Sequence, residues 1–544
     1  MKLLIVGGVA GGASAAARAR RLSEDAHIVV VERGPDVSFA NCGMPYYVGE
    51  EIESREKLLI VTPDRLRERF RLDVRTRSSV EAIDRAAKTV RVCELSTGRV
   101  YEEPYDKLLL APGAAPLVPA IPGTDLPGVF TLRTLNDADR IKAAVDAGGS
   151  AIILGAGFIG LELAENFVRR GVATTVIQKD TQVLSPFDPE MMTGVEEHLR
   201  QRGVDLVLGQ TATAIHQLPG GLEVHLTDGR TLRSHFVILG IGVRPESRLA
   251  SEAGLALGVN GGVQVNEHMQ TSDPDIYAVG DAVQVEDFIT HAPALIPLAG
   301  PANRQGRIAA DHIMGRSEAR YRGTQGTAII RVFERVAAIT GVSEKTLKRI
   351  GRAYRKVYVH PAHHAGYYPG AQAMTLKLLF DPQSGAVLGA QAVGGDGVDK
   401  RIDVLSMAIQ AGMTVFDLEE AELAYAPQFG SAKDPVNMAG FVAAGLLRGE
   451  HPQLDAEAVR TGDRLLLDVR TPEEYAAGHI PGAINVPVDD LRCRLGELPR
   501  DRDIAAYCQV GQRGYLATRI LRQSGYRASN VSGGYKSYVN TCRK

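Results

Sequence analysis

Two cysteines stand in surroundings that suit sulfur chemistry. Cys42 lies in the stretch SFANCGMPYY, between an asparagine and a glycine, and Cys508 opens the stretch CQVGQRG. A cysteine thiolate is a nucleophile that can form a mixed disulfide, a persulfide or a sulfenic acid. The sequence therefore predicts thiol or sulfane-sulfur chemistry at two separate places in the chain.

The number and spacing of the five cysteines argue against a disulfide framework and against a zinc site. They are too few and too scattered for a disulfide framework, and no C-x-x-C pair has zinc-ligand spacing. A reducing cytosol suits such a chain, and Cys93, Cys493 and Cys542 have no special surroundings. A group of nearby histidines lacks a carboxylate or cysteine cluster, so we expect a loop leading to Tyr367 and no metal site: His360, His363 and His364.

Length and composition favour small-molecule chemistry. The 544 residues, 44% of them hydrophobic and 23% charged, predict three or four domains that each bury a core. A net charge of -2 provides no basic surface for nucleic acid, and no apolar run reaches the roughly 18 residues that a membrane span needs. We therefore expect a cytoplasmic protein without a nucleic-acid or membrane partner.

A nucleotide-binding pattern opens the chain. KLLIVGG predicts a strand, AGGASAAARARRL a helix, and HIVVVE a second strand that ends at Glu32. Gly7 and Gly12 flank a turn at which the helix N-terminus would bind a pyrophosphate, while the acid would bind a ribose hydroxyl. Val9 stands where the usual pattern has its middle glycine.

The pattern returns in AIILGAGFIGLELAENFVRRG, at Gly155, Gly157 and Gly160, and the strand ATTVIQ follows. Two such folds in one chain predict two dinucleotides that exchange electrons. At the end of the second strand a glutamate would favour NADH and an arginine NADPH. Gln178 and Lys179 stand there instead. Since one lysine is a poor phosphate clamp, we expect NADH, with NADPH as the alternative.

Three further segments resemble the flavin disulfide oxidoreductases: YDKLLLAPGAAP, FVILGIGVRPES and TSDPDIYAVGDA. The resemblance implies that Asp281 binds the ribityl chain of FAD. It also implies an α/β chain with Rossmann-like FAD and NAD(P) domains and an α+β dimerisation domain. The implied ranges are 1–115 and 245–320 for FAD, 116–244 for NAD(P), and 321–445 for dimerisation.

Cys42 differs from the dithiol members of that superfamily. They carry a C-x-x-x-x-C pair, whereas Tyr47 stands five residues after Cys42. We therefore expect Cys42 to work alone and to receive its electron pair through the flavin.

A closer resemblance is to the coenzyme A disulfide reductases, over residues 1 to about 445. It rests on four segments: SFANCGMPYY, HAGYYPGAQ, DKRIDVLSMAI and AYAPQFGSAKDPVNMAG. It implies a homodimer in which Cys42 holds half of a CoA disulfide. Tyr367 and Tyr425 of the other subunit would stabilise or protonate the departing CoA thiolate. Ala10 and Asn41 replace the histidine of related NADH peroxidases and the serine of related peroxidases and oxidases, which favours a thiol substrate.

The resemblance also implies binding residues. Arg18 and Arg21 lie three apart on the first predicted helix and so share a face that could meet CoA phosphates. The implied CoA contacts are Ser14, Arg18, Arg21, Ser38, Asn41, Asn303 and Lys433. The implied cofactor contacts are Gly7, Gly12, Glu32, Arg33, Val80, Ala111, Gly113, Asp281, Pro297, Ala299, Gly155, Gly157, Phe158, Ile159, Gly160, Glu162, Gln178, Lys179 and Gly242.

The C-terminal segment, 455–544, is similar to α/β rhodanese domains through LLLDVRTPEEYAAGHIPGAINVP and DIAAYCQVGQRGYLATRILRQSGY. We predict a strand that ends at Tyr507, a loop that begins at Cys508, and a helix after Gly514. Backbone N–H groups and a helix N-terminus would stabilise a thiolate or persulfide at the cysteine, and Arg513 adds positive charge. Four residues separate Cys508 from Arg513, one fewer than in cysteine phosphatases, which suits sulfane sulfur.

The combined prediction is an FAD-dependent NAD(P)H reductase of CoA persulfide, polysulfide and CoA disulfide that works through Cys42. Cys508 would carry sulfane sulfur by way of the long pantetheine arm of CoA, and hydrosulfide and CoA would leave. The alternatives are a plain CoA disulfide reductase that keeps CoA reduced, an NADH oxidase, and a redox sensor or sulfur-carrier adaptor.

Overall fold

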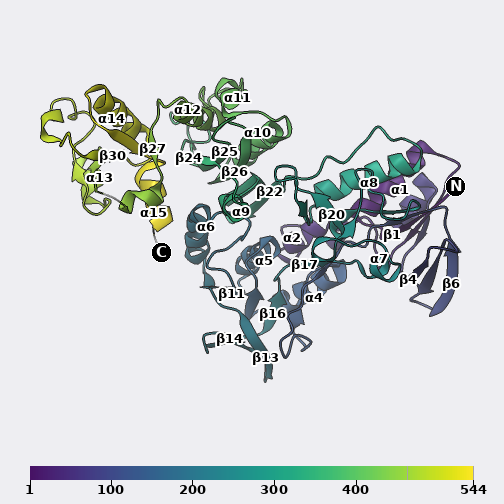
Figure 1. Ribbon diagram of the computed structural model, residues 1–544. Helices are drawn as coiled ribbons and strands as arrows, with labels where there is room; N and C mark the ends of the chain where they lie inside the picture. Colours follow the sequence, from purple (N-terminus) through teal and green to yellow (C-terminus); the bar gives the residue numbers. More distant parts are fainter. Residues whose placement is uncertain (462, 543–544) are drawn as a thin grey trace. The chain divides into compact units, whose positions relative to one another are not determined.

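Two units make up the computed structural model, which describes residues 1–461 and 463–542 (Figure 1). One unit comprises Met1–Val183 and Arg202–Gly326, and the other comprises Leu184–Gln201 and Thr327–Lys544. The segment 184–201 falls within the predicted range 116–244, and in the structure it packs with the second unit.

The first unit begins with a parallel five-stranded sheet in the order β19-β7-β1-β2-β3. Alternate side chains of a strand point to opposite faces. Leu3 and Ile5 pack against α1 and α8, while Leu4 and Val6 pack against the antiparallel sheet β4-β5-β6. The strands of the parallel sheet are β1 (Lys2–Val6), β2 (His27–Val31), β3 (Asp73–Arg75), β7 (Lys107–Leu110) and β19 (Ile276–Ala278).

The two nucleotide-fold patterns of the sequence are confirmed as strand–helix–strand units. Helix α1 (Ala10–Leu22) joins β1 to β2, and α5 (Phe158–Arg169) joins β10 to β11. The second parallel sheet has the order β12-β11-β10-β16-β9. Its strands are β9 (Val129–Phe130), β10 (Ser150–Leu154), β11 (Ala173–Gln178), β12 (Val204–Leu208) and β16 (Phe236–Leu239).

Smaller elements complete the first unit. The antiparallel sheets comprise β4 (Ser78–Asp84), β5 (Thr89–Glu94) and β6 (Arg99–Pro104); β8 (Ala114–Pro116) and β17 (Val243–Pro245); and β13 (Ala212–Leu218), β14 (Gly221–Leu226) and β15 (Thr231–Ser234). A mixed sheet comprises β18 (Val263–Gln264), β20 (Val283–Glu286) and β21 (Pro293–Ala294). The remaining helices are α2 (Met44–Val48), α3 (Pro63–Phe70), α4 (Leu135–Asp146), α7 (Arg248–Glu252), α8 (Ala299–Ile313), η1 (Asn41–Gly43), η2 (Arg55–Leu58), η3 (Val259–Gly261) and η4 (Gly280–Ala282).

The second unit contains an antiparallel sheet in the order β22-β23-β26-β25-β24. Helix α10 packs on β23 and β26, and α12 packs on β24 and β25. The elements are β22 (Ala328–Val332), β23 (Arg335–Gly341), β24 (Arg355–Val359), β25 (Thr375–Phe380), β26 (Val387–Gly394), α6 (Pro189–Gln201), α9 (Glu344–Ile350), α10 (Val398–Gln410), α11 (Val415–Glu420) and α12 (Pro435–Leu447).

A second sheet of this unit is parallel, in the order β27-β31-β30-β28-β29. Ile504, Ala506 and Cys508 pack on the side of α14, whereas Ala505 and Tyr507 pack on the side of α15. The elements are β27 (Gln453–Leu454), β28 (Arg464–Asp468), β29 (Ile484–Asn485), β30 (Asp503–Tyr507), β31 (Ala528–Val531), α13 (Pro472–Ala476), α14 (Gln512–Gln523), α15 (Gly534–Cys542), η5 (Ala456–Arg460) and η6 (Leu495–Glu497).

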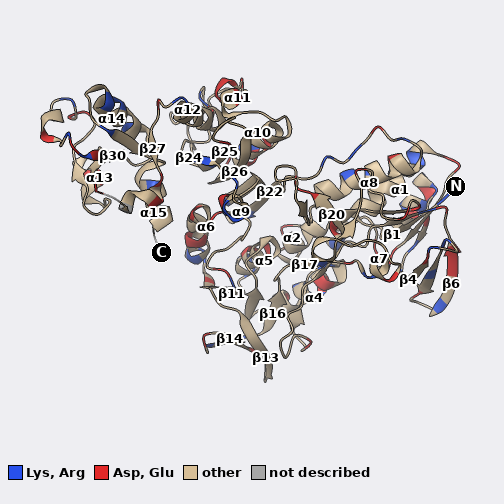
Figure 2. Ribbon diagram, in the orientation of Figure 1, with Lys and Arg blue, Asp and Glu red and all other residues tan. Residues whose placement is uncertain are grey.

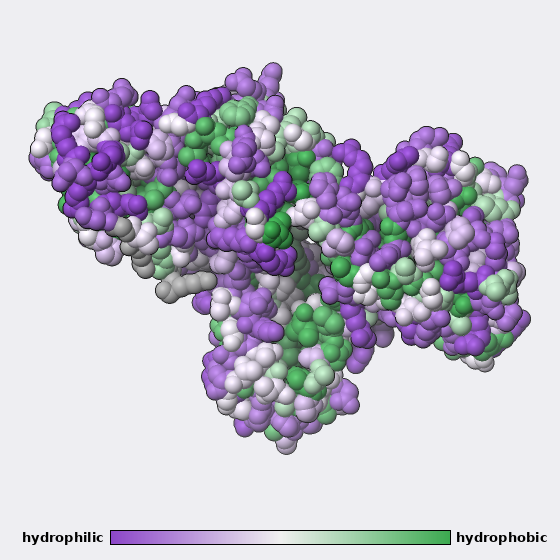
Figure 3. All heavy atoms as spheres, viewed as in Figure 1, coloured by the Kyte–Doolittle hydropathy of each residue, from purple (hydrophilic) through white to green (hydrophobic). Residues whose placement is uncertain are grey.

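The surface carries charges of both signs along most elements (Figure 2), and apolar areas interrupt a mostly hydrophilic exterior (Figure 3). In the second unit Met407 and Phe429 are 63% and 70% exposed. Among the described residues, no helix combines the length and the apolarity that crossing a bilayer requires.

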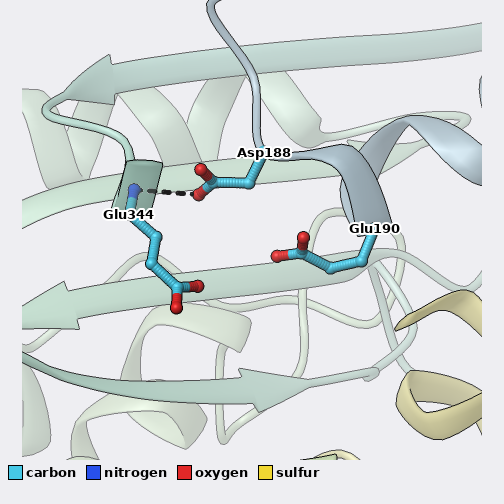
Figure 4. A group of neighbouring side chains, drawn as sticks. All are labelled: Asp188, Glu190 and Glu344. Atoms are coloured by element: carbon cyan, nitrogen blue, oxygen red, sulfur yellow. Dashed lines mark hydrogen bonds between the residues drawn. The ribbon is translucent and has the colours of Figure 1, made fainter. Parts of the chain in front are cut away.

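A buried lysine holds three segments of the second unit together. Lys377, on β25, is fully buried, and its Nζ lies 2.8 Å from Asp188 Oδ2, 2.5 Å from Glu190 Oε1 and 2.6 Å from Glu344 Oε2. Figure 4 shows the three acids converging, with the backbone N–H of Glu344 donating to Asp188. Their oxygens are close enough to hold a metal ion, but the lysine ammonium contacts all three. The group is therefore a lysine-centred ion cluster.

Electrostatics keep this cluster charged. Burial alone would raise the pKa of Glu344, but Lys377 and then Lys356 hold it far below its usual range. Burial would likewise lower the pKa of Lys377, and the surrounding Tyr358 and acids raise it well above its usual value. Removing one partner of such a buried group leaves the others uncompensated.

We expect Lys377→Met to lower the free energy of unfolding by about 3–5 kcal/mol, because three acids then face one another without their cation. The loss should be smaller at pH 5 than at pH 8, since protonation relieves the acids. Urea unfolding at both pH values measures it. The control Lys348→Met removes an exposed lysine 2.8 Å from Glu344 and should cost at most about 1 kcal/mol. Equal losses in both variants would contradict the role of the buried cluster.

Candidate functional site

A cavity of about 350 Å³ opens where four strands of the first sheet end. Its walls come from the residues that follow β1, β2, β7 and β19, which is where dinucleotides bind in open parallel sheets. Seven predicted cofactor contacts line it: Gly7, Glu32, Arg33, Val80, Ala111, Gly113 and Asp281. Gly12, Pro297 and Ala299 lie outside this lining.

Glycine makes the turn before α1 possible. Gly7 has φ +99°, and a Cβ there would lie 2.2 Å from the carbonyl oxygen of Ala111. A Cβ at Gly12 would lie 1.9 Å from the carbonyl oxygen of Gly7. The helix therefore packs tightly against its strand and leaves its N-terminus at the cavity.

Acidic and basic side chains complete this cavity. The carboxylate of Glu32 accepts backbone hydrogen bonds from Gly8, at 2.8 Å, and Gly34, at 2.7 Å. Burial raises the pKa of Asp281, and Arg133 opposes that shift. An acid at the end of the second strand, an open helix N-terminus and a nearby arginine fit an adenine dinucleotide such as FAD.

The second nucleotide fold repeats this geometry. A Cβ at Gly160 would lie 2.0 Å from the carbonyl oxygen of Gly155, as in the first fold. Gln178 occupies the place of Glu32, and its Oε1 accepts a hydrogen bond from the backbone N–H of Ala156 at 2.9 Å. Gly157 precedes α5, and a Cβ there would meet no atom within 4 Å. That open space suits a second dinucleotide.

The remaining predicted contacts of the second dinucleotide lie around the same turn. Phe158 and Ile159 begin α5, and Ile159 is 39% exposed. Gly242 follows β16 with φ +120°, and Lys179 follows β11. Asp180, which no sequence motif pointed to, lies at the same turn, and its Oδ2 accepts a hydrogen bond from Gln178 Nε2 at 3.3 Å.

Cys42 lies in the short helix η1, directly before α2. Helix α2 packs against α4 and α5 of the second nucleotide fold. A Cβ at Gly49 would lie 1.8 Å from Asn166 Oδ1, so only glycine permits this approach. Asn41 lines the cavity of the first fold. The cysteine is thus placed beside both nucleotide folds of this unit.

The surroundings of Cys42 are acidic. Although the residue keeps an exposed face, desolvation of its thiol raises the pKa, and the charges of Glu162 and Asp281 raise it further. Burial raises the pKa of Glu162 to about 7, and Tyr46 Oη donates to its Oε1 at 3.4 Å. Tyr47 donates instead to Asp139 at 3.1 Å. Sequence analysis assigned Glu162 only to cofactor binding and gave Tyr46 no role.

Tyr367 and Tyr425 come together in the second unit. Their hydroxyl oxygens are 3.0 Å apart, and the residues are 77% and 49% exposed. The hydrogen bond to Tyr425 raises the pKa of Tyr367, which keeps its phenol protonated. Lys433, a predicted CoA contact, is exposed in the same unit, immediately before α12.

The other predicted CoA contacts of the first unit lie mainly on α1 and α8. Ser14 Oγ donates to Asn303 Oδ1. Arg18 Nε donates to Asp311 at 2.7 Å, so its charge is already paired. Burial, Arg307 and Arg18 lower the pKa of Arg21. No sequence pattern pointed to Arg307, because only the packing of α8 on α1 brings it close to Arg21. Ser38 precedes η1 with φ 49°.

The loop after β30 surrounds Cys508. The cysteine is 1% exposed, and the backbone N–H of Gly511 donates to its Sγ at 3.2 Å. The strand ends at Tyr507 as predicted, but α14 begins at Gln512 rather than after Gly514. Gly511 adopts φ +97°, which completes the turn early. Arg513 lies in the first turn of α14 and pairs with Glu474, an interaction that sequence analysis missed.

The three predicted histidines form side-chain contacts of their own. His360 Nδ1 lies 3.0 Å from Thr375 Oγ1, and its Nε2 lies 3.0 Å from Ser537 Oγ. Burial lowers the pKa of His360 to about 3. His363 and His364 pack ring against ring.

Comparisons with known proteins agree on three regions. The model for pyridine nucleotide-disulphide oxidoreductases matches residues 1–306, the dimerisation-domain model of that class matches 328–435, and the rhodanese-like domain model matches 452–541. A coenzyme A disulfide reductase of Staphylococcus aureus (strain bovine RF122 / ET3-1) is 36% identical over 444 residues, which are 81% of this chain and 99% of that enzyme.

Two solved structures extend the similarity to the C-terminal segment. Reduced Bacillus anthracis CoADR-RHD is 47% identical, with a TM-score of 0.98 and coverage of 100% of this chain and 98% of that one. An NAD-dependent persulfide reductase from A. fulgidus is 37% identical, with a TM-score of 0.93 and coverage of 99% and 100%. The α/β architecture with a dimerisation domain and a rhodanese domain is confirmed.

We expect Glu162→Gln to accelerate alkylation of Cys42 by iodoacetamide several-fold at pH 8, because loss of a negative charge favours the thiolate. The effect should fade below about pH 7, where Glu162 itself becomes protonated. Mass spectrometry of the Cys42 peptide measures the rate. Glu53→Gln, which removes an exposed acid paired with Lys57, is the control. An unchanged rate in Glu162→Gln would show that this charge does not act on Cys42.

Proposed function

This chain belongs to the pyridine nucleotide-disulphide oxidoreductase family, and we propose that it reduces CoA disulfide, CoA persulfide and polysulfide at Cys42. The family implies FAD and a nicotinamide dinucleotide as cofactors. In this proposal a rhodanese-type cysteine, Cys508, carries sulfane sulfur, and CoA and hydrosulfide are released.

The observation that carries the proposal is the placement of the accessible thiol of Cys42. Cys42 adjoins a cavity that fits FAD, packs beside a second nucleotide fold, and is a free cysteine. Tyr47, five residues on, bonds to Asp139, so that position supplies no second redox group. A lone thiol of this kind suits a substrate that itself brings the second sulfur.

Bound in the two folds, FAD and the nicotinamide would supply one electron pair to the sulfur at Cys42. Glu32, Asp281 and the turn at Gly7 would hold the first dinucleotide. Gln178 and the turn at Gly157 would hold the second. The CoA substrates in this proposal come from the names of the relatives. The thiol–disulfide exchange in it comes from the single thiol of Cys42.

With CoA disulfide, the Cys42 thiolate attacks one sulfur, CoA thiolate leaves, and Cys42 stays joined to the other CoA. With CoA persulfide, attack on the CoA sulfur expels hydrosulfide, whereas attack on the outer sulfur expels CoA thiolate. Each route takes one electron pair to restore the Cys42 thiolate. Because the pKa of Cys42 is raised, the thiol must lose its proton in each turnover before it can attack.

Tyr367 and Tyr425 are proposed to act from the second subunit of a homodimer. They are exposed aromatic residues on a surface with further exposed apolar side chains, which suits coverage by a partner. The hydrogen bond with Tyr425 raises the pKa of Tyr367, so the Tyr367 phenol stays protonated at neutral pH and can donate a proton to a departing CoA thiolate. Ser14, Arg21 and Asn41 are proposed to contact CoA, and Lys433 to do so across the dimer. Arg18 would first have to give up Asp311.

Cys42→Ser should abolish NADH oxidation with CoA disulfide, CoA persulfide and polysulfide. Cys508→Ser should keep the disulfide activity and lose most hydrosulfide release from the sulfane substrates. NADH oxidation and hydrosulfide release, measured side by side, test this. Cys493→Ser, at an exposed cysteine, is the matched control.

If Cys508→Ser matches the wild type on every substrate, the rhodanese segment is accessory and the enzyme is a plain CoA disulfide reductase. Rapid oxygen consumption without any thiol substrate would favour an NADH oxidase instead. Turnover below a few per minute on all substrates would favour a sensor or adaptor.

We also propose NADH as the donor, because a 2'-phosphate at the end of β11 would approach the negative charge of Asp180. Wild-type kcat/KM should be higher for NADH than for NADPH, and Asp180→Asn should narrow that ratio several-fold. Asp205→Asn, at an exposed acid on β12, should leave it unchanged. Equal use of both nucleotides by the wild type would refute the preference.

A further inference from the structure

Arg513 interacts with the side chains of both Glu474 and Cys508, and its interactions with Glu474 are the stronger. Arg513 Nη1 donates to Glu474 Oε2 and Nη2 donates to Glu474 Oε1, both at 2.7 Å. The two residues come from different elements, α14 and α13. Two parallel bonds of this kind use the Nη1/Nη2 edge of the guanidinium, an edge with which an arginine can bind a carboxylate or an oxyanion in a bidentate way. Glu474 therefore occupies that edge of Arg513, which also hydrogen-bonds to Cys508.

Glu474 is itself fixed in place. Thr471 and Glu474 form a capping box at the start of α13, in which Glu474 N donates to Thr471 Oγ1 and Thr471 N donates to Glu474 Oε2. The hydrogen bond from Arg513 lowers the pKa of Glu474 to about 2, so it is ionised at neutral pH. Glu474 is therefore held both by the capping box and by Arg513, which keeps the ion pair in place.

The neighbouring Arg470 fixes the other end of the same loop. It is 2% exposed, pairs with the fully buried Asp468, and donates from Nη1 to Gln509 Oε1 at 3.0 Å. The segment 468–474 thus holds the cysteine loop at Gln509 and at Arg513. In Figure 2, acidic and basic residues lie around α13 and α14.

The pairing of Arg513 with Glu474 affects which sulfur donors can react with Cys508. A thiosulfate donor carries a sulfonate group, and its three oxygens need a cationic fork as sulfite leaves. A persulfide has no oxygen at its sulfane sulfur and needs only the backbone N–H groups around Sγ, such as that of Gly511.

We propose that Glu474 is a specificity-determining residue that disfavours sulfonate donors at Cys508 by keeping Arg513 occupied. This inference rests on the proposed sulfur-carrying role of Cys508 and deepens it. Glu474 acts through Arg513 and is therefore a positioning residue.

The chemistry balances for both donors. The Cys508 thiolate attacks the outer sulfur of thiosulfate, the S–S bond breaks, and sulfite leaves with the electron pair. With CoA persulfide the same attack expels CoA thiolate, and the proton of the persulfide passes to solvent. Cyanide then takes the outer sulfur from the Cys508 persulfide, which forms thiocyanate and restores the thiolate.

The test compares thiocyanate formation from thiosulfate and from CoA persulfide in the full-length protein. In Glu474→Gln the ratio of kcat/KM for thiosulfate to kcat/KM for CoA persulfide should rise at least about tenfold. Arg513 would then be free to form a charged hydrogen bond with the sulfonate oxygens of thiosulfate. The change should lie mainly in the KM for thiosulfate. A misfolded rhodanese segment would lose both activities, so a gain on one donor cannot arise from damage.

Glu473→Gln is the matched control, because Glu473 adjoins Glu474 on α13, is exposed, and bonds to Thr471 rather than Arg513. Its donor ratio should equal that of the wild type. The double variant Glu474→Gln with Arg513→Met should lose the gain on thiosulfate, since the freed arginine is its cause. Cys508→Ser sets the zero of the assay.

The outcomes separate the two claims. If the wild type transfers sulfur from CoA persulfide and Glu474→Gln leaves the donor ratio unchanged, the role of Glu474 is overturned and the carrier role of Cys508 stands. A gain that persists in the double variant also overturns it. If the wild type transfers sulfur from neither donor, the carrier role of Cys508 fails, and this inference fails with it.

Discussion

The contact between α2 and α5 fixes the position of Cys42, the thiol that we propose as the reactive group of the first unit. At Gly49 the chain of the first nucleotide fold passes so close to Asn166 of the second that any side chain would collide with it. Tyr46, on the same short helix, donates to Glu162. Because η1 and its Cys42 directly precede this helix, the thiol is fixed beside the two folds. The acidic surroundings of Cys42 and the proposed electron path depend on that packing.

The two cysteines that we propose as reactive lie in physically different surroundings. Cys42 keeps an exposed face among acids, which raises the pKa of its thiol. Cys508 is buried and accepts a hydrogen bond from a backbone N–H group in the loop 508–511 that leads into α14. The surroundings of Cys42 favour a thiol that stays protonated until it loses its proton during the reaction, at a site open to substrate. The surroundings of Cys508 place the sulfur atom next to a backbone N–H group in a small enclosure, which suits the sulfur-carrying role that we propose.

Charged pairs between distant segments hold the second unit together. Lys377 contacts acids from α9 and from the segment that leads into α6, and Lys356 links Glu344 to Glu457. His360 bonds to Ser537 on α15. These contacts join the antiparallel sheet to the rhodanese-like segment within one unit.

The sequence alone determined the local elements and the class of chemistry. The predicted helix of residues 10–22, both nucleotide turns and the strand that ends at Tyr507 follow from apolar periodicity and from glycines whose neighbours leave no room for a side chain. The tertiary structure alone decided which charges meet. Arg18 pairs with Asp311 and Arg513 with Glu474, across 293 and 39 residues of chain. No local pattern encodes such pairs, because they arise only when separate elements pack and bring their side chains within bonding distance.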